Sequence, residues 1–254
     1  MENSNNRIGE VNYNKSGLEM IIVEYNNYKN ITVHFTKSGS YIKTRYDHFT
    51  EGSTKDPYDK TIFSIGYLGI GKYKSSKNKN KNIQYYTWRN MFVRCYSEEY
   101  RYKFPSYINC TVSNEWYNYQ NFGKWYDENY YDIENQRMEL DKDILHKGNK
   151  IYSPKTCVFV PRNINCLFTK RESERGKYPI GVYYREDNNK YMASCNNGNG
   201  INEFLGIFNN KEKAFEEYKN YKENLIKTIA EKYKNTIPEK LYKAMYKYKV
   251  NIYD

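Results

Sequence analysis

The 254-residue chain lacks the features that mark membrane, secreted and zinc-binding proteins. No apolar run is long enough to cross a bilayer, and the N-terminal stretch MENSNNRIGE has no signal-peptide core. The cysteines, at positions 95, 110, 157, 166 and 195, form no C-x-x-C pair, and the histidines, at 34, 48 and 146, show no metal-ligand spacing. We therefore expect no membrane partner, no zinc site, reduced thiols and a cytoplasmic location.

Aliphatic residues are also scarce, and the 30 acidic residues are outnumbered by 41 lysines and arginines. Hydrophobic residues make up 39% of the chain, the mean hydropathy is −1.02, and 31 of the aromatic residues are tyrosines. This composition predicts several small modules with tyrosine-rich cores instead of one thick core. The net charge of +11 favours a polyanionic partner, most simply nucleic acid. An AT-rich genome, which enriches Lys, Asn, Tyr and Ile, is the alternative explanation.

The N-terminal part is predicted to contain a small β module over residues 1–60 and a basic linker over 61–82. Segments 18–25, 30–35 and 40–49 are rich in β-branched and aromatic residues, with turn signals between them. No acidic residue occurs from Lys60 to Ser97. We expect the cations of this run either to contact phosphate or to form an ordinary solvated segment: Lys72, Lys74, Lys77, Lys79, Lys81, Arg89 and Arg94.

Residues 83–168 are predicted to form a helical lead-in followed by a β-hairpin and a helix. Aromatic residues recur at spacings of three and four around Trp88 and again around Trp116, which predicts two helices with apolar faces. The segment 138–165 has the composition of a hairpin with charges at its tip. Gly148-Asn149 supplies a turn, Ser153-Pro154 is a possible helix start, and Val158-Phe159-Val160 is a buried run.

These segments resemble the ββα-metal (HNH) nucleases of phages and mobile elements, which include homing endonucleases. In the hairpin the resemblance rests on Asp141, Gly148, Asn149, Ser153, Pro154, Thr156, Cys157, Phe159, Val160 and either Asn163 or Asn165. In the lead-in it rests on Trp88, Met91, Arg94, Cys95, Tyr96, Cys110, Val112, Trp116, Tyr119, Phe122 and Trp125. Two positions depart from the family pattern. Lys142 stands where the general-base His is found, and Thr156 replaces the central Asn.

The resemblance implies a site for one Mg²⁺ or Mn²⁺, if the protein is catalytic. Asp141 is the expected ligand, with Asp143 as a second carboxylate, and Asn163 or Asn165 the residue that orients the base. Lys142 is a poor general base because the pKa of a lysine side chain is ordinarily about 10.4, and His146 is the alternative. Cleavage is therefore expected to be weak or absent.

After a linker at 169–177, residues 178–254 are predicted to form a second module. Three short strands with tight turns precede a helix that begins near Asn209 or Asn210, and a docking helix follows Pro238. This order resembles the APETALA-type (ethylene-response-factor) DNA-binding domain. The matching residues are Gly181, Val182, Lys190, Tyr191, Ala193, Leu205, Gly206, Phe208, Ala214, Phe215 and Tyr218.

In that family, the sheet face opposite the helix lies in the major groove of DNA. Period-two alternation predicts which residues lie on this face. Together with Lys190, we expect the following to bind nucleic acid: Tyr183, Arg185, Ser194, Asn196, Asn202 and Phe204. Only Arg185 matches one of the several arginines of the plant proteins, which argues against strong guanine readout.

The sequence thus predicts an α+β protein with a small N-terminal β module, a central helical plus ββα core, and a C-terminal three-stranded sheet packed on a helix. The leading hypothesis is a phage-type protein of the bacterial cytoplasm that binds double-stranded DNA and is a weakened or inactive endonuclease. The alternative is a non-enzymatic phage protein that captures a host nucleoprotein or defence complex, as anti-CRISPR proteins do.

Overall fold

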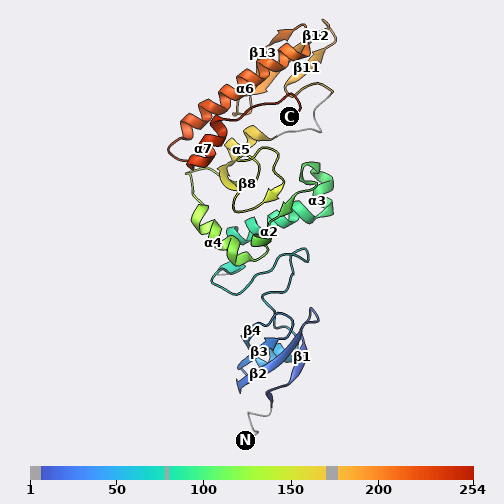
Figure 1. The fold of residues 1–254 in the computed structure, drawn as a ribbon, viewed down its shortest axis with the longest axis vertical. Helices are drawn as coiled ribbons and strands as arrows, with labels where there is room; N and C mark the ends of the chain where they lie inside the picture. The colour runs from blue at the N-terminus through green and yellow to red at the C-terminus, as the bar shows by residue number, and fades with distance from the viewer. Residues whose placement is uncertain (1–6, 78–79, 170–176) are drawn as a thin grey trace. The chain divides into compact units, whose positions relative to one another are not determined.

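The computed structural model describes residues 7–77, 80–169 and 177–254. It contains helices and several small sheets, which confirms the mixed α+β class (Figure 1). The chain divides into two compact units, Met1–Asp127 and Glu128–Asp254. No helix within the described ranges is both long and apolar enough to span a membrane.

The first unit begins with a four-stranded antiparallel sheet in the order β1-β2-β3-β4. Its elements are β1 (Val11–Tyr13), β2 (Glu19–Asn27), β3 (Asn30–Phe35), β4 (Tyr41–Thr44) and the short helix α1 (Tyr46–Thr50). One face of this sheet forms a core with α1, made by Met20, Ile22, Ile31, Val33, Phe35 and Phe49. The strand predicted over 40–49 was too long. It ends at Thr44, and one helical turn then directs Tyr46 and Phe49 into the same core.

Residues 61–76 are attached to the helices of this unit, although the sequence predicts a linker there. The backbone of Tyr67 accepts a bond from the N–H of Tyr119 and donates to the carbonyl of Tyr117, at 2.9 Å each. The amide of Gln120 donates to the carbonyls of Leu68 and Tyr73. A short β5 (Ser76–Lys77) and β6 (Asn80–Lys81) form a hairpin before the first long helix.

The predicted helical lead-in is formed by α2 (Ile83–Tyr96), α3 (Glu98–Lys103) and α4 (Tyr119–Asn129). Between α3 and α4 lie η2 (Pro105–Tyr107), β7 (Thr111–Val112) and η3 (Asn114–Trp116). The aromatic stripes are core, as expected from their spacing. Their buried members are Trp88, Met91, Phe92, Cys95, Trp116, Tyr119, Phe122 and Trp125.

The second unit contains the predicted hairpin and helix. They are β8 (Met138–Asp141), β9 (Ile151–Tyr152), β10 (Val158–Pro161) and α5 (Arg162–Phe168), with β8 antiparallel to β10. The helix start expected at Ser153-Pro154 is wrong. Ser153 instead closes a single turn, its carbonyl accepting the N–H of Cys157 at 3.0 Å, and the chain then extends into β10. The helix begins only after Pro161.

The C-terminal module has the predicted sheet and helix. Strands β11 (Val182–Arg185), β12 (Lys190–Asn196) and β13 (Asn202–Phe208) form an antiparallel sheet in that order, and α6 (Lys211–Tyr233) packs along it (Figure 1). Gly181, just before β11, has φ +76°. A Cβ there would lie 2.0 Å from the Tyr218 ring, so glycine is required for α6 to approach.

One hydrophobic core joins the hairpin to the end of the chain. Residues of β10 and α5 pack with residues of α6 and α7 (Glu239–Tyr246): Val158, Val160, Ile164, Leu167, Ile226, Ala230, Leu241 and Met245. The hairpin and the C-terminal helices therefore stabilise each other, although the sequence places them on either side of a linker. Of that linker, residues 170–176 lie outside the described residues.

Candidate nucleic-acid interface

The sheet β11–β13 has one face covered by α6 and one outer face, and the strand register arranges the outer residues in rows. One row pairs Arg185 with Lys190. The next row contains Tyr183, Met192 and Ile207. Beyond it, Ser194 pairs with Phe204 and then Asn196 with Asn202. The face thus runs from cations through apolar side chains to amides.

The middle of this outer face exposes large apolar side chains. Tyr183 is 51% exposed, Phe204 is 62% exposed and Ile207 is 39% exposed. On the opposite face, Val182, Ala193 and Cys195 are buried against α6. The alternation of buried and exposed residues puts the six predicted contact residues of the sheet, together with Lys190, on one side.

Sequence reasoning missed two members of this face, Met192 and Ile207. Alternation along β12 would have included Met192, which lies between Lys190 and Ser194. Ile207 was harder to find because a β-bulge in β13 shifts the register, and Gly206 adopts φ +136° there. Counting by twos from Phe204 gives Gly206 instead of Ile207.

The electrostatics of the face are positive but modest. The guanidinium of Arg185 donates to both carboxylate oxygens of Asp187, at 3.0 and 2.6 Å. This pairing lowers the pKa of Asp187 and raises that of Arg185. Lys190 is exposed beside it, and none of the strand residues on the outer face is acidic.

Part of the basic run before α2 lies outside the described residues. In the described part, more of the positive charge is neutralised than the sequence suggests. Lys79 and the side chains of Lys77 and Lys81 lie outside the described residues. Lys72 forms an exposed ion pair with Asp127 of α4 at 3.5 Å, and Lys74 donates to the carbonyl of Gly71. Among the helical cations, Arg89 is exposed and Arg94 lies over the Tyr107 ring. The folded chain thus supplies an acid that the local sequence lacks.

In the hairpin loop, Asp141 has a structural role. Its Oδ1 accepts the backbone N–H groups of Asp143 and Ile144, at 2.8 and 2.7 Å, and so closes the turn that follows β8. Burial, with the neighbouring charge of Asp143, raises the pKa of Asp141 to about 6. The turn is therefore built around this carboxyl group.

Lys142 and His146, the two candidates for the base, are placed differently. Lys142 is buried, and its ammonium donates to the carboxylate of Asp143 at 3.1 Å. An ammonium that donates to a carboxylate has no lone pair with which to accept a proton from water. His146 is exposed, and in the described part of the chain no hydrogen bond or ion pair joins its imidazole to Asp141 or Asp143.

The two candidate asparagines lie near the opposite end of the hairpin. Asp141 pairs with Val158, whereas α5 follows Pro161, which pairs with Met138. Asn163 donates to the Tyr233 hydroxyl at 2.7 Å, and Asn165 donates to Glu139 at 2.8 Å. Neither amide is joined to the Asp141 loop by a hydrogen bond within the described residues.

This donor set does not fit a Mg²⁺ or Mn²⁺ site. Such ions take carboxylate and carbonyl oxygens gathered around one point. Here Asp141 caps a turn and Asp143 is paired with Lys142. Among residues 7–77, 80–169 and 177–254, no group of three or more His, Cys, Asp or Glu side chains gathers closely enough to hold an ion.

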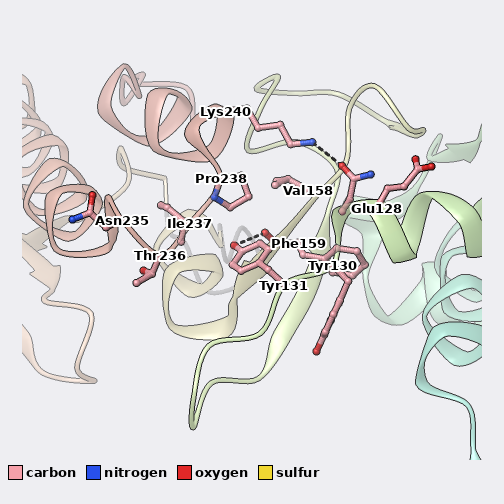
Figure 2. A pocket seen from close by; sticks show the side chains of 11 residues that line it. Glu128, Tyr130, Tyr131, Val158, Phe159, Asn235, Thr236, Ile237, Pro238 and Lys240 are labelled. Atoms are coloured by element: carbon pink, nitrogen blue, oxygen red, sulfur yellow. Dashed lines mark hydrogen bonds between the residues drawn. The ribbon is translucent and has the colours of Figure 1, made fainter.

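A pocket of about 370 Å³ in the second unit lies between β10 and the turn after α6. Figure 2 shows Tyr131, whose hydroxyl donates to the Phe159 carbonyl, and Lys240, which reaches Asn129 at 3.4 Å. Glu128 and Asn235 lie on opposite sides of this view (Figure 2).

Comparisons with known proteins give no match: no protein-family model, no curated protein and no solved structure is similar to this chain at a significant level.

Proposed function

We propose that this protein binds nucleic acid through the outer face of the sheet β11–β13. One observation carries the proposal: a solvent-exposed sheet face holds Tyr183 and Phe204 beside Arg185 and Lys190, with no acidic strand residue among them. Phosphates are attracted by the cations, and bases and sugars offer partners for rings and amides. The net charge of +11 supports a polyanionic ligand.

The resemblance found in the sequence supports the same proposal. Three antiparallel strands with one packed helix are what an APETALA-type domain requires, and the outer face is the one such a domain presents to DNA. Because fold alone does not assign a function, the proposal rests on the side chains of this face. Double-stranded DNA and a phage-type origin remain predictions from the resemblance.

In this proposal the hairpin is a scaffold and not an efficient nuclease. Its buried residues complete the core that holds α6 and α7, and α6 supports the sheet. Asp141 closes the loop through its Oδ1 and Lys142 pairs with Asp143, so the expected nuclease activity with Mg²⁺ or Mn²⁺ is weak or absent.

A titration of the full chain with fluorescent DNA tests the proposal. We expect binding that weakens with salt, by about 0.9 log unit per log unit of salt for each phosphate neutralised. Lys190→Glu should lower the affinity, because it places a carboxylate at the cationic end of the face. Lys43→Glu is the matched control on the N-terminal sheet, where Lys43 is also an exposed strand residue.

Two results would contradict the proposal. One is the absence of binding to any nucleic acid at low salt. The other is an equal loss of affinity in Lys190→Glu and Lys43→Glu, which would show that net charge matters but this face does not. Both variants carry the same charge change, so only the position of the carboxylate differs.

A further inference from the structure

The outer face of β11–β13 has a composition that differs from that of a surface that reads duplex DNA. The edges of paired bases in the major groove present hydrogen-bonding groups, and the thymine methyl is the main apolar feature. The middle of this face is instead apolar, with Tyr183, Met192, Ile207 and Phe204 in adjacent rows. Covering these side chains with polar base edges would leave the edges without hydrogen-bond partners.

We infer that the face binds single-stranded nucleic acid, whose unstacked bases lie on the Tyr183 and Phe204 rings. This inference rests on the proposed function and names its ligand class. Stacking on an aromatic ring is tolerant of base identity because every base has a π-face. Exposed aromatic residues on a sheet surface are a common means of holding unpaired bases.

The two rings are available for such contacts. Tyr183 and Phe204 are 51% and 62% exposed. In the described part of the chain, neither ring contacts another aromatic ring. Tyr184, the neighbour of Tyr183, points to the other face and packs on Tyr191, with ring centroids 5.2 Å apart. The strand thus separates a structural tyrosine from an uncovered one.

The polar ends of the outer face offer partners for the phosphates and base edges of a single-stranded nucleic acid. Arg185 and Lys190 lie at one end, where a backbone phosphate is attracted. Asn196 and Asn202 lie at the other end, where amides can bond the free Watson–Crick edge of an unpaired base. The rows between them span roughly 20 Å at about 3.3 Å per residue, enough for several nucleotides.

The test compares an oligo(dT) single strand with a DNA duplex of equal length, both titrated against the full chain at the same salt concentration. We expect the single strand to bind more tightly. Tyr183→Ala and Phe204→Ala should each weaken single-strand binding by about 5- to 150-fold, the usual range for a base stacked on an aromatic residue. Tyr183→Phe and Phe204→Tyr should retain binding because a ring remains.

Tyr41→Ala is the matched control, because Tyr41 is also an exposed tyrosine on a sheet surface, at 61% in the N-terminal sheet. Unchanged thermal unfolding of each variant shows that a loss of binding is not a loss of fold. Tighter duplex binding that is insensitive to Tyr183→Ala and Phe204→Ala would overturn the inference and leave the proposed function standing. No binding to either DNA or to an oligo(U) RNA would overturn both, and would favour a protein partner for the apolar rows.

Discussion

The N-terminal sheet β1–β4 and the C-terminal sheet β11–β13 are alike in architecture but differ in their outer faces. Each has one face packed on a helix and one face exposed. The outer face of β1–β4 also exposes rings, Tyr13 and Tyr41, but they lie among the acids Glu19 and Glu24, and the Tyr41 ring is stacked on His34 with centroids 4.6 Å apart. The outer face of β11–β13 has two cations, no acidic strand residue and two uncovered rings. In the proposed function, side chains and not sheet topology distinguish the binding surface from the N-terminal sheet.

The largest expected effect concerns how the helix meets each sheet. Gly181→Ala should destabilise the C-terminal module by about 2–5 kcal/mol, since it adds left-handed backbone strain and a clash with Tyr218. Gly39→Ala in the turn between β3 and β4, with φ +74° and open space where its Cβ would lie, should cost only about 1–2 kcal/mol. Chemical denaturation measures both. Equal losses of unfolding free energy in the two variants would mean that Tyr218 of α6 does not lie close to Gly181.

The hairpin that supports the C-terminal sheet should give the protein an unusual pH response. In the folded chain Asp141 holds its proton up to about pH 6, whereas an unfolded Asp loses it near pH 4. Unfolding therefore releases a proton between these values, and the free energy of unfolding falls as pH rises from about 4 to 6, by at most about 3 kcal/mol.

Asp141→Asn tests this origin. The amide oxygen can still accept both backbone N–H groups of the turn, so the variant should fold and lose that pH dependence. Denaturation midpoints at pH 4.5 and 7.5 give the comparison. A folded Asp141→Asn variant that keeps the wild-type pH profile would contradict the assignment of this pH dependence to the Asp141 carboxyl group.

A second carboxylate, that of Glu223, should make the free energy of unfolding depend on pH in the opposite direction. Glu223 of α6 is buried, and burial opposes the ionisation of its carboxyl group. The ammonium of Lys249 and the N–H of Val250 donate to the carboxylate, and these bonds outweigh burial, so the pKa of Glu223 is lowered. Its contribution is present above the unfolded pKa and is lost as pH falls through the folded value. Glu223→Gln should cost about 1–2 kcal/mol at pH 7 and less in acid. A constant loss across pH would exclude the ionic origin.

The smallest expected effect is a change in nucleic-acid affinity when either of two similar exposed ion pairs is broken, one in each sheet module. Arg45 and Arg185 each donate to both oxygens of an aspartate, Asp47 and Asp187. Asp187→Asn should raise nucleic-acid affinity several-fold at low salt, because Arg185 becomes free to contact phosphate. Asp47→Asn should leave affinity unchanged. If the two variants behave alike, the binding surface is not specific to the C-terminal sheet.

The sequence was sufficient to predict the features that depend only on residues close together in the chain. Period-two alternation along the strands predicted the outer face around Tyr183 and Ser194. The spacing of three and four residues predicted the buried side of the helix around Trp88. It did not predict the bulge near Gly206, because one inserted residue depends on cross-strand pairing. It also could not show that Asp127 would meet Lys72, since they are distant in the chain.

The candidate catalytic site shows the same limit. The pattern around Asp141 indicated a metal ligand, and the structure uses its Oδ1 to close a turn. Asn163 and Asn165 were selected by their place after the hairpin, but the β8–β10 register puts them at the far end from Asp141. Sequence spacing cannot report which end of a strand pair a side chain occupies.

Photo-crosslinking with a 4-thiothymidine oligonucleotide, followed by mass spectrometry of the cross-linked peptides, tests the central claim most directly. We expect the cross-links to fall in β11–β13, at or beside Tyr183 and Phe204, and to disappear in the Tyr183→Ala, Phe204→Ala double variant. Cross-links concentrated in β1–β4, at Tyr13 or Tyr41, would contradict it.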